Sequence, residues 1–594
     1  MQEPKQRKDM NPEFMWDFSH IYATKADWEA ALVDAEKAIE VAASYKGKLT
    51  ASAEALADGL DAIYSVAEKF EKAYSYAFLH KEADNSDPEY QDMSARAMSL
   101  YVKFSTAISF SEPEMLTLGK ETLLSYLDSC PRLEKYRFTI TDLIRSAEHV
   151  LDEKSEALLA GMSEGASAPG EAYDMLTGVD MEFPNVIGEN GEELPLTGGN
   201  FGVYRESECR AVREDAFEKM FGTYKKFINT IAATYGGSVK FDCFRAKARG
   251  YSSALEAALS AGNVPLSVYN NLIDEIHEAI PTMKKYIDLR ARALGKEKVD
   301  MFDLYVPIVE GVAETLPYEN AKELVKAACA PLGERYVELL DEAYNNHWID
   351  VYENKGKSTG AFSAGVYGVH PYVMLNYTDT LDDAFTLAHE LGHAMHSYFS
   401  SEAQDYVNHD YRIMVAEVAS TVNEVLLTKY LLKTETDEKK RAYILNHFLE
   451  GFRGTVLRQT LFAEFERESH AMCEAGKPLT AQALNAVYKA LISKYYEGAE
   501  INDVMQYEWS YIPHFYRAFY VYQYSTGFCS AVAIAGKIAE GGDPSDYLKF
   551  LTTGGSDYPL EELKIAGVDL TKPDTVRDAM KIFDETVDEL AKLI

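Results

Sequence analysis

The stretch 380–396 reads TLDDAFTLAHELGHAMH and contains the pattern HExxH at His389, Glu390 and His393. We expect a helix to begin at Thr380, because Thr380 and Asp383 have the spacing of a capping box with Asp in place of Glu. Side chains four residues apart project from the same side of a helix, so the two imidazoles can reach one metal ion. Glu390 points off that axis and can take a proton from water activated by the metal.

The third metal ligand is expected on a second helix, which the apolar pattern of YRIMVAEVASTVNEVLLTKYLL predicts for residues 411–432. Glu417 lies in the first half of this helix, and we interpret it as the third ligand. A solvated surface residue is the alternative, which its apolar neighbours disfavour. Ser420 and Glu424 follow on the same face, and we interpret Glu424 as a carboxylate that accepts a hydrogen bond from a ligand imidazole. Imidazoles combined with a hard carboxylate favour zinc.

A third histidine, His396, follows His393 by three residues and is close enough to approach the metal. A catalytic metal site keeps three protein ligands and one open position, which another imidazole would crowd. We therefore expect His396 to support the site or to pack in the interior.

The composition argues against several classes of partner. The chain has 594 residues, with 59 Lys and Arg against 95 Asp and Glu, and its net charge of −36 repels phosphate, so we expect no nucleic-acid partner. Six cysteines without a CxxC pair indicate neither a disulfide framework nor a thiolate zinc site. No apolar run approaches the roughly 20 residues of a membrane span, and the N-terminus lacks the apolar core of a signal peptide. We expect a cytoplasmic protein with no membrane partner.

Outward from the metal motif, the chain is predicted to be mainly α-helical. The apolar spacing after Thr24 and after Thr50 predicts two long antiparallel helices, and helical periodicity returns over 205–350 and again beyond 380. Asn190 and Gly191 lie between two apolar segments, which predicts a hairpin with a type I′ turn and positive φ at both residues.

The most strand-like segment of the second half is 360–378, immediately before the metal motif. Its portion Pro371–Tyr377 either binds the backbone of a substrate as an added strand or is an ordinary buried strand. Gly and Pro accumulate between 161 and 204, so we place a boundary there. The expected parts are a helical region over 1–115, a subdomain with the hairpin over 116–204 and a catalytic domain over 205–594.

These motifs resemble the M3 family of metallopeptidases, and within it the oligoendopeptidase F group. The resemblance is carried by HELGHAMH at 389–396 and AEVASTVNE at 416–424, and by less diagnostic segments along nearly the whole chain. These segments are WDFSHIYAT at 16–24, GKSTGAFS at 356–363, VLRQTLFAEFE at 456–466, IPHFYRAFYVYQYSTG at 512–527 and GGSDYPLEELKIAGVDL at 554–570.

The resemblance implies a large helical clamshell that encloses a deep substrate channel, with a small β element next to the metal-site helix. It also implies internal cleavage of short, unstructured peptides in the cytoplasm, with one Zn²⁺ per chain. In the family a His and downstream tyrosines stabilise the oxyanion, and His514 matches that His. The tyrosine spacing departs from that of thimet oligopeptidase, so Tyr516, Tyr520, Tyr522 and Tyr524 all remain candidates, with Tyr520 and Tyr524 sharing a helix face.

The expected chemistry is attack of water on a peptide carbonyl, with His389, His393 and Glu417 as zinc ligands and Glu390 as general base. Two alternatives remain open: a different HExxH peptidase, and a catalytically silent peptide-binding protein. Side-chain preference, peptide length, physiological substrate and oligomeric state are not determined by these patterns.

Overall fold

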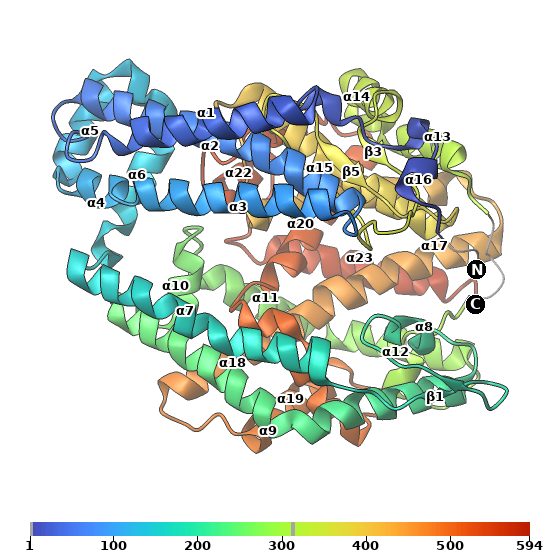
Figure 1. The fold of residues 1–594 in the computed structure, drawn as a ribbon. Coiled ribbons are helices and arrows are strands. Elements are labelled where there is room, and N and C mark those ends of the chain that lie inside the picture. The colour runs from blue at the N-terminus through green and yellow to red at the C-terminus, as the bar shows by residue number, and fades with distance from the viewer. Residues whose placement is uncertain (1–3, 310–314) are drawn as a thin grey trace. The chain divides into compact units, whose positions relative to one another are not determined.

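A computed structural model describes residues 4–309 and 315–594 of the chain. The protein is mainly α-helical, as predicted, and within the described residues its strands form two small sheets (Figure 1). Residues 310–314, which belong to the stretch predicted to be helical over 205–350, lie outside the described residues.

Two compact units divide the chain, and each is assembled from three separated segments. The first unit comprises 1–150, 313–430 and 534–567, and the second comprises 151–312, 431–533 and 568–594. This interleaved division differs from the three consecutive parts expected over 1–115, 116–204 and 205–594, which stay a prediction about the organisation of the sequence.

The first unit contains ten helices and one further short helix among its described residues, and α16 (Ile413–Thr434) begins in it. The ten are α1 (Lys25–Ala43), α2 (Ala53–Ala83), α3 (Pro88–Ile108), α4 (Ser111–Leu116), α5 (Gly119–Ser129), α6 (Arg137–Ser146), α13 (Tyr318–Cys329), α14 (Glu334–Asn345), α15 (Leu381–Ala403) and α21 (Ser545–Leu551). The short α22 (Pro559–Ile565) completes this unit.

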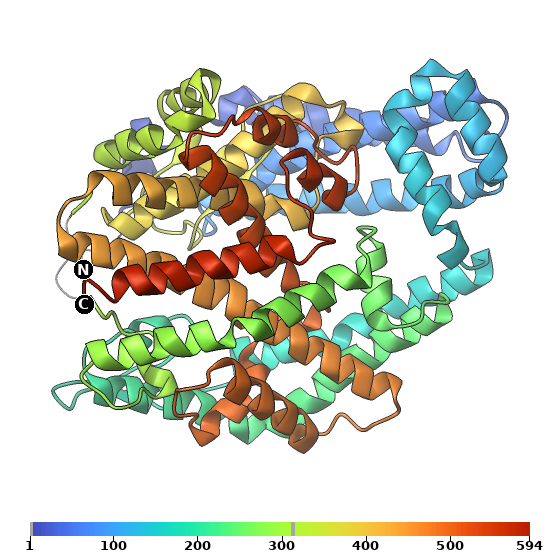
Figure 2. The ribbon, with the colours of Figure 1, turned by 180° about the vertical axis from the view of Figure 1, so that it is seen from behind.

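The second unit contains α7 (Glu153–Met175), α8 (Phe201–Arg205), α9 (Arg210–Ala248), α10 (Ala254–Ser260), α11 (Leu266–Glu278), α12 (Ile280–Ala293), α17 (Glu438–Gly451), α18 (Arg458–Glu474), α19 (Ala481–Tyr495) and α23 (Asp574–Leu590). The helix α20 (Tyr522–Ala539) begins in it. The C-terminal α23 packs against α11, α12 and α17 (Figure 2).

Two predicted helices open the chain and pack together with α3 (Figure 1). The Thr24 hydroxyl caps α1 by accepting the Asp27 N–H at 3.2 Å, and the apolar face predicted for this helix is buried, with Trp28 fully enclosed. The second helix begins at Ala53 and is capped by Ser52, so the predicted start at Thr50 was three residues too early.

The predicted hairpin is present, but its turn is not type I′. Strands β1 (Val186–Ile187) and β2 (Glu193–Leu194) pair antiparallel, with Val186 opposite Leu194. Gly191 has a φ of 85°, whereas Asn190 does not adopt the left-handed conformation. The Gly188 N–H donates to the Glu192 carbonyl at 2.8 Å, which closes a three-residue loop in which only the last residue needs positive φ.

The glycine- and proline-rich stretch that begins at 161 is not a loop throughout. The helix α7 runs through it to Met175 and includes Pro169. Helix propensity is a weak local term that tertiary packing overrides, and α7 packs along α9.

A three-stranded sheet lies beside the HExxH helix, with the order β3 (Ile349–Asp350), β5 (Tyr372–Met374) and β4 (Phe362–Ala364). Because β5 pairs with β3 on one side and with β4 on the other, it has no free edge to accept an added strand. The prediction that Pro371–Tyr377 binds substrate in this way was therefore wrong, and its alternative as a buried strand is confirmed.

A buried ion cluster fastens this sheet to the N-terminal segment. Asp350 of β3 is 1% exposed and accepts hydrogen bonds from Arg7 and Lys357, the latter at 2.8 Å. Burial disfavours the charged Asp350 carboxylate, but the two cations hold its pKa below the usual value. Within the described residues, no helix combines the length and apolar character needed to cross a membrane.

Candidate metal centre

The HExxH helix begins where the sequence predicts. The Thr380 hydroxyl accepts the Asp383 N–H at 3.1 Å, and the Asp383 carboxylate accepts the Thr380 N–H at 2.9 Å. This reciprocal capping box fixes the first turn of α15, from which His389, Glu390 and His393 follow on regular helix.

Helices α15 and α16 meet closely at the motif. An added Cβ atom on Gly392 would be 2.5 Å from the Ala419 carbonyl oxygen, so only glycine fits at this crossing. The buried Asn423 side chain donates to the Ala388 carbonyl at 3.0 Å and accepts the Tyr336 hydroxyl at 2.9 Å. Gly392 and Asn423 therefore fix the spacing of the two helices. The sequence patterns did not predict this role, although a glycine in mid-helix is a usable signal.

The predicted ligand atoms converge. Glu417 Oε2 lies 3.4 Å from His389 Nε2 and 3.5 Å from His393 Nε2, and the three ligand atoms all lie within 4.8 Å of one another. Ligand atoms bonded at about 2.1 Å to a tetrahedral zinc ion lie about 3.4 Å apart. The distances from Glu417 to both imidazoles, and the chemistry of the donors, therefore fit zinc.

The other residues of α16 orient these ligands. His389 Nδ1 lies 3.1 Å from Glu424 Oε1, which directs the Nε2 atom of the same ring toward Glu417. The Ser420 hydroxyl donates to Glu417 Oε2 at 3.2 Å. The carboxylate predicted to support a ligand imidazole is thus in contact with one.

The electrostatics of the three ligands are coupled. Burial opposes the charged form of His389, but the neighbouring carboxylates, Glu424 first, raise its pKa to about 9. Burial opposes ionisation of Glu417, yet the two imidazoles lower its pKa to about 2. A metal ion needs neutral imidazole, so its binding must displace a proton from His389 and becomes weaker as the pH falls.

Glu390 is 6% exposed and lies on α15 between the two imidazoles in sequence. Burial raises the pKa of its carboxyl above the usual value, and the two histidines oppose this shift. A raised pKa makes the carboxylate a more effective general base near neutral pH.

His396 is fully buried and packs as a neutral ring. It stacks on Tyr411 with ring centroids 3.6 Å apart and an interplanar angle of 4°, and burial lowers its pKa to about 3. Of the two roles expected for His396, interior packing is the one that the contacts support.

The tyrosine candidates separate into two groups in the second unit. The Tyr516 hydroxyl lies 2.7 Å from that of Thr234 and its ring stacks on Tyr173, while Tyr522 is buried against Tyr269. These contacts are those of packing residues.

By contrast, the rings of Tyr520 and Tyr524 gather around His514, each with its centroid 6.3 Å from the imidazole. Among the described residues, no protein group hydrogen-bonds to the Tyr520 hydroxyl or to the His514 ring. Spacing alone could not distinguish Tyr516 from Tyr520, because Thr234, far away in the chain, lies within hydrogen-bond distance of the Tyr516 hydroxyl.

The protein is mainly helical, and the helix that follows the HExxH helix brings a glutamate close to both histidines. The profile of peptidase family M3 matches residues 203–582, and that of oligopeptidase F matches residues 114–183. The chain is 41% identical to oligopeptidase PepF of Bacillus subtilis over 99% of its own length and 88% of the relative.

Solved structures agree with these matches. The protein is similar to a putative peptidase from Chlamydophila abortus, with a TM-score of 0.91 and 32% identity over all of both chains. It is also similar to oligoendopeptidase F from Enterococcus faecium, with a TM-score of 0.76 and 38% identity over 96% of this chain and 99% of the other. The chain belongs to peptidase family M3, in its oligoendopeptidase F group.

Proposed function

We propose that this peptidase is a zinc-dependent endopeptidase that hydrolyses internal bonds of short, unstructured peptides and holds one Zn²⁺ per chain. The observation that carries the proposal is the convergence of His389 Nε2, His393 Nε2 and Glu417 Oε2, with the carboxylate about as far from each imidazole as the ligands of tetrahedral zinc lie from one another. The presence of Glu390 on the same helix gives this site a base, which a purely structural metal site does not need.

When bound, zinc would polarise the scissile carbonyl and lower the pKa of a water molecule. Glu390 takes the proton of the attacking water and delivers it to the leaving amine. Burial suits Glu390 to both steps, because a raised pKa lets the same carboxyl hold the proton between them. Glu424 keeps the Nδ1 proton of His389 in place, so that Nε2 presents its lone pair to the metal.

The tetrahedral intermediate carries an oxyanion that requires hydrogen-bond donors. His514, Tyr520 and Tyr524 are proposed to supply them, on the basis of their chemistry, their clustering and the M3 resemblance. Burial and the nearby Arg517 lower the pKa of His514, which favours a neutral imidazole that donates through its single N–H.

The restriction to short peptides and the cytoplasmic location follow from the family resemblance, and the relatives are named as oligopeptidases. A catalytically silent peptide-binding protein is the alternative. It predicts binding of peptides without turnover, and a hydrolysis assay distinguishes the two.

The test is cleavage of an internally quenched peptide of about nine residues, with the products read by mass spectrometry. We expect internal cuts that a chelator abolishes and zinc restores. Glu390→Gln should keep zinc and lose nearly all turnover. Glu402→Gln, which changes an exposed glutamate at the far end of the same helix, should behave as the parent. Zinc-loaded parent protein that binds the peptides without cutting them would establish the silent alternative.

A further inference from the structure

The residue immediately before Tyr520 has an unfavourable backbone conformation. Phe519 has a φ of 60°, in the left-handed region that residues with a Cβ atom rarely adopt. Such a conformation persists only where the surrounding structure holds it, and it is often found at functional sites. Something must therefore hold Phe519.

Two residues of α18, one helical turn apart, contact Phe519 from the same side. Glu466 Oε1 accepts the Phe519 N–H at 2.8 Å in a buried hydrogen bond. The ring of His470 lies 4.4 Å from the Phe519 ring, and its Nδ1 donates to the Glu466 carbonyl at 2.8 Å. Glu466 thus fixes the main chain of Phe519, while His470 packs on its side chain.

The Glu466 carboxyl is fully buried, and burial raises its pKa well above the usual range, with nearby Asp242 adding to the effect. Burial therefore favours the neutral form of this carboxyl, and its Oε1 atom accepts the Phe519 N–H. A glutamine has the same shape and also offers a neutral carbonyl oxygen, so it can replace this function.

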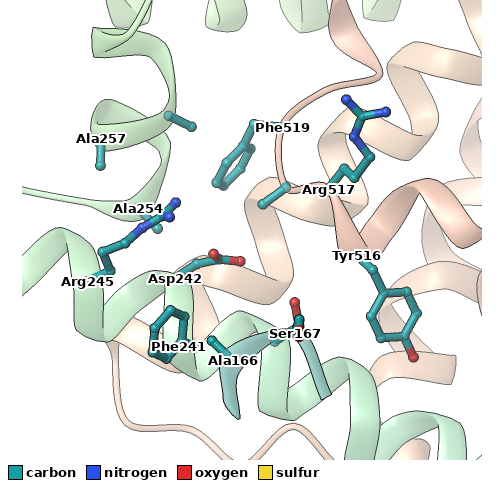
Figure 3. A pocket seen from close by; sticks show the side chains of 13 residues that line it. Ala166, Ser167, Phe241, Asp242, Arg245, Ala254, Ala257, Tyr516, Arg517 and Phe519 are labelled. Atoms are coloured by element: carbon teal, nitrogen blue, oxygen red, sulfur yellow. The ribbon is translucent and has the colours of Figure 1, made fainter. Parts of the chain in front are cut away.

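Phe519 belongs to the loop that carries His514 and Tyr520, two of the three proposed donors. Residues 516–519 line one side of a cavity of about 320 Å³, which α9 and α10 line with Asp242, Arg245 and Ala254 (Figure 3). The left-handed residue turns the chain between His514 and Tyr520 so that their rings lie 6.3 Å apart and nearly parallel, at 16°. A change of φ at residue 519 would redirect Tyr520 first, because Tyr520 is the next residue.

We propose that Glu466 is a positioning residue, which holds Phe519 in the left-handed conformation and so fixes the positions of Tyr520 and His514, two of the proposed oxyanion donors. The inference rests on the proposed function for the role of Tyr520 and His514 as oxyanion donors. The anchor itself, which is the hydrogen bond from the Phe519 N–H to Glu466 Oε1, is a property of the folded chain and can be measured without substrate.

The first readout is hydrogen exchange of the Phe519 amide, measured in substrate-free protein by mass spectrometry of peptides that cover this residue. In the parent protein we expect protection, because the amide donates to a buried acceptor. Glu466→Met has a similar length but no acceptor and should lose the protection, whereas Glu466→Gln should keep it. An unprotected Phe519 amide in the parent would overturn the proposal even if no variant folds.

The second readout is turnover of the quenched peptide. Glu466→Met should lower kcat by about tenfold to a hundredfold, as expected for donors displaced by about 1 Å, while KM changes little. Glu466→Gln should stay within about twofold of the parent in both parameters, because its acceptor is retained. A parental kcat in Glu466→Met despite an exchanging Phe519 amide would refute the positioning role, as would equal damage in the two variants.

A matched control is available on the same helix. Glu464 is a buried carboxylate of α18 that binds the Tyr495 hydroxyl at 2.7 Å and His277, away from the loop. Glu464→Met should lower the melting temperature but leave Phe519 exchange and kcat unchanged. If the parent protein proves inactive, the proposed function has failed, while the exchange rates still report separately on the Glu466 anchor.

Discussion

Gly392 of α15 lies so close to Ser420 of α16 that a Cβ atom on Gly392 would be 2.5 Å from the Ser420 Cα atom. The contact lies beside residues of the candidate metal centre. Gly392 directly precedes His393, and Ser420 donates a hydrogen bond to Glu417. The separation between the imidazole and carboxylate ligands is therefore set by a backbone contact that any side chain would push apart.

Gly392→Ala should disrupt the metal centre without removing a ligand. The added methyl group meets backbone rather than a flexible side chain, so the helices must separate, at a cost of about 3 kcal/mol. We expect a lower melting temperature and zinc that is lost on dialysis. Gly222→Ala is the control, because Gly222 is also within a helix but has open space around it, and this variant should be as stable as the parent or more so. Full zinc retention by Gly392→Ala would contradict this prediction.

Removal of Glu424 should weaken the metal site through His389. Glu424→Ala leaves the Nδ1 atom of His389 without its carboxylate partner, and losses of this kind lower metal affinity by about 10- to 100-fold. Competition with a chromophoric chelator measures the affinity directly. Glu424→Gln retains an acceptor oxygen and should lie between the parent and Glu424→Ala. Unchanged affinity in Glu424→Ala would show that this contact does not support the ligand.

Glu417→Ala should have a larger effect than either Glu424 variant, because it removes a ligand rather than the support of one. Zinc content after dialysis is the measurement. If the variant retains stoichiometric zinc, Glu417 is not the third ligand.

The sequence could single out the three residues whose possible ligand atoms converge, because much of their arrangement is short-range geometry. The His389–His393 spacing and the Thr380 capping box lie within a single helix, where periodicity places side chains directly. Glu417 needed one further step, the recognition of a second apolar helix. Its distance from the imidazoles depends on the crossing at Gly392, which periodicity does not describe.

Other features depend on long-range packing and could not be predicted in this way. The type I′ expectation at Asn190 failed because loop length, not the dipeptide alone, selects the turn. The roles of Tyr516 and Tyr520 differ because Thr234, 282 residues away in the chain, binds one hydroxyl and not the other. The pairing of β5 with a strand on each edge likewise depends on tertiary structure.

A buried carboxyl in the stretch 554–570 should make stability depend on pH. Glu562 is 1% exposed, and burial raises its pKa to about 8. Because the folded state holds the proton more tightly than the unfolded state, the favourable contribution is complete below about pH 4.5 and is lost as the pH rises through about 8. Relative to Glu562→Gln, the parent should lose on the order of 3 kcal/mol across this window.

The measurement is the difference in melting temperature between parent and Glu562→Gln at pH values from 5 to 8. The difference should change steadily in favour of the variant as the pH rises. Glu561→Gln is the control, because this neighbouring side chain is exposed and forms a surface ion pair with Lys564. A difference that does not vary with pH would mean that Glu562 is ionised throughout.

The last prediction concerns the four tyrosines between residues 516 and 524. Removing their hydroxyl groups one at a time distinguishes a catalytic role from a packing role. Loss of one oxyanion donor costs about 10²- to 10³-fold in kcat, so Tyr520→Phe or Tyr524→Phe should fall in this range with little change in KM. Tyr516→Phe removes a hydroxyl that binds Thr234, and Tyr522→Phe alters a buried packing residue, so both should keep kcat within about threefold and change mainly the melting temperature. His514→Ala should lower kcat to a similar extent as Tyr520→Phe and Tyr524→Phe. Because all four phenylalanine variants retain the ring, a large kcat loss in Tyr516→Phe with a parental Tyr520→Phe would reverse the assignment and place the donor on the other side of the loop.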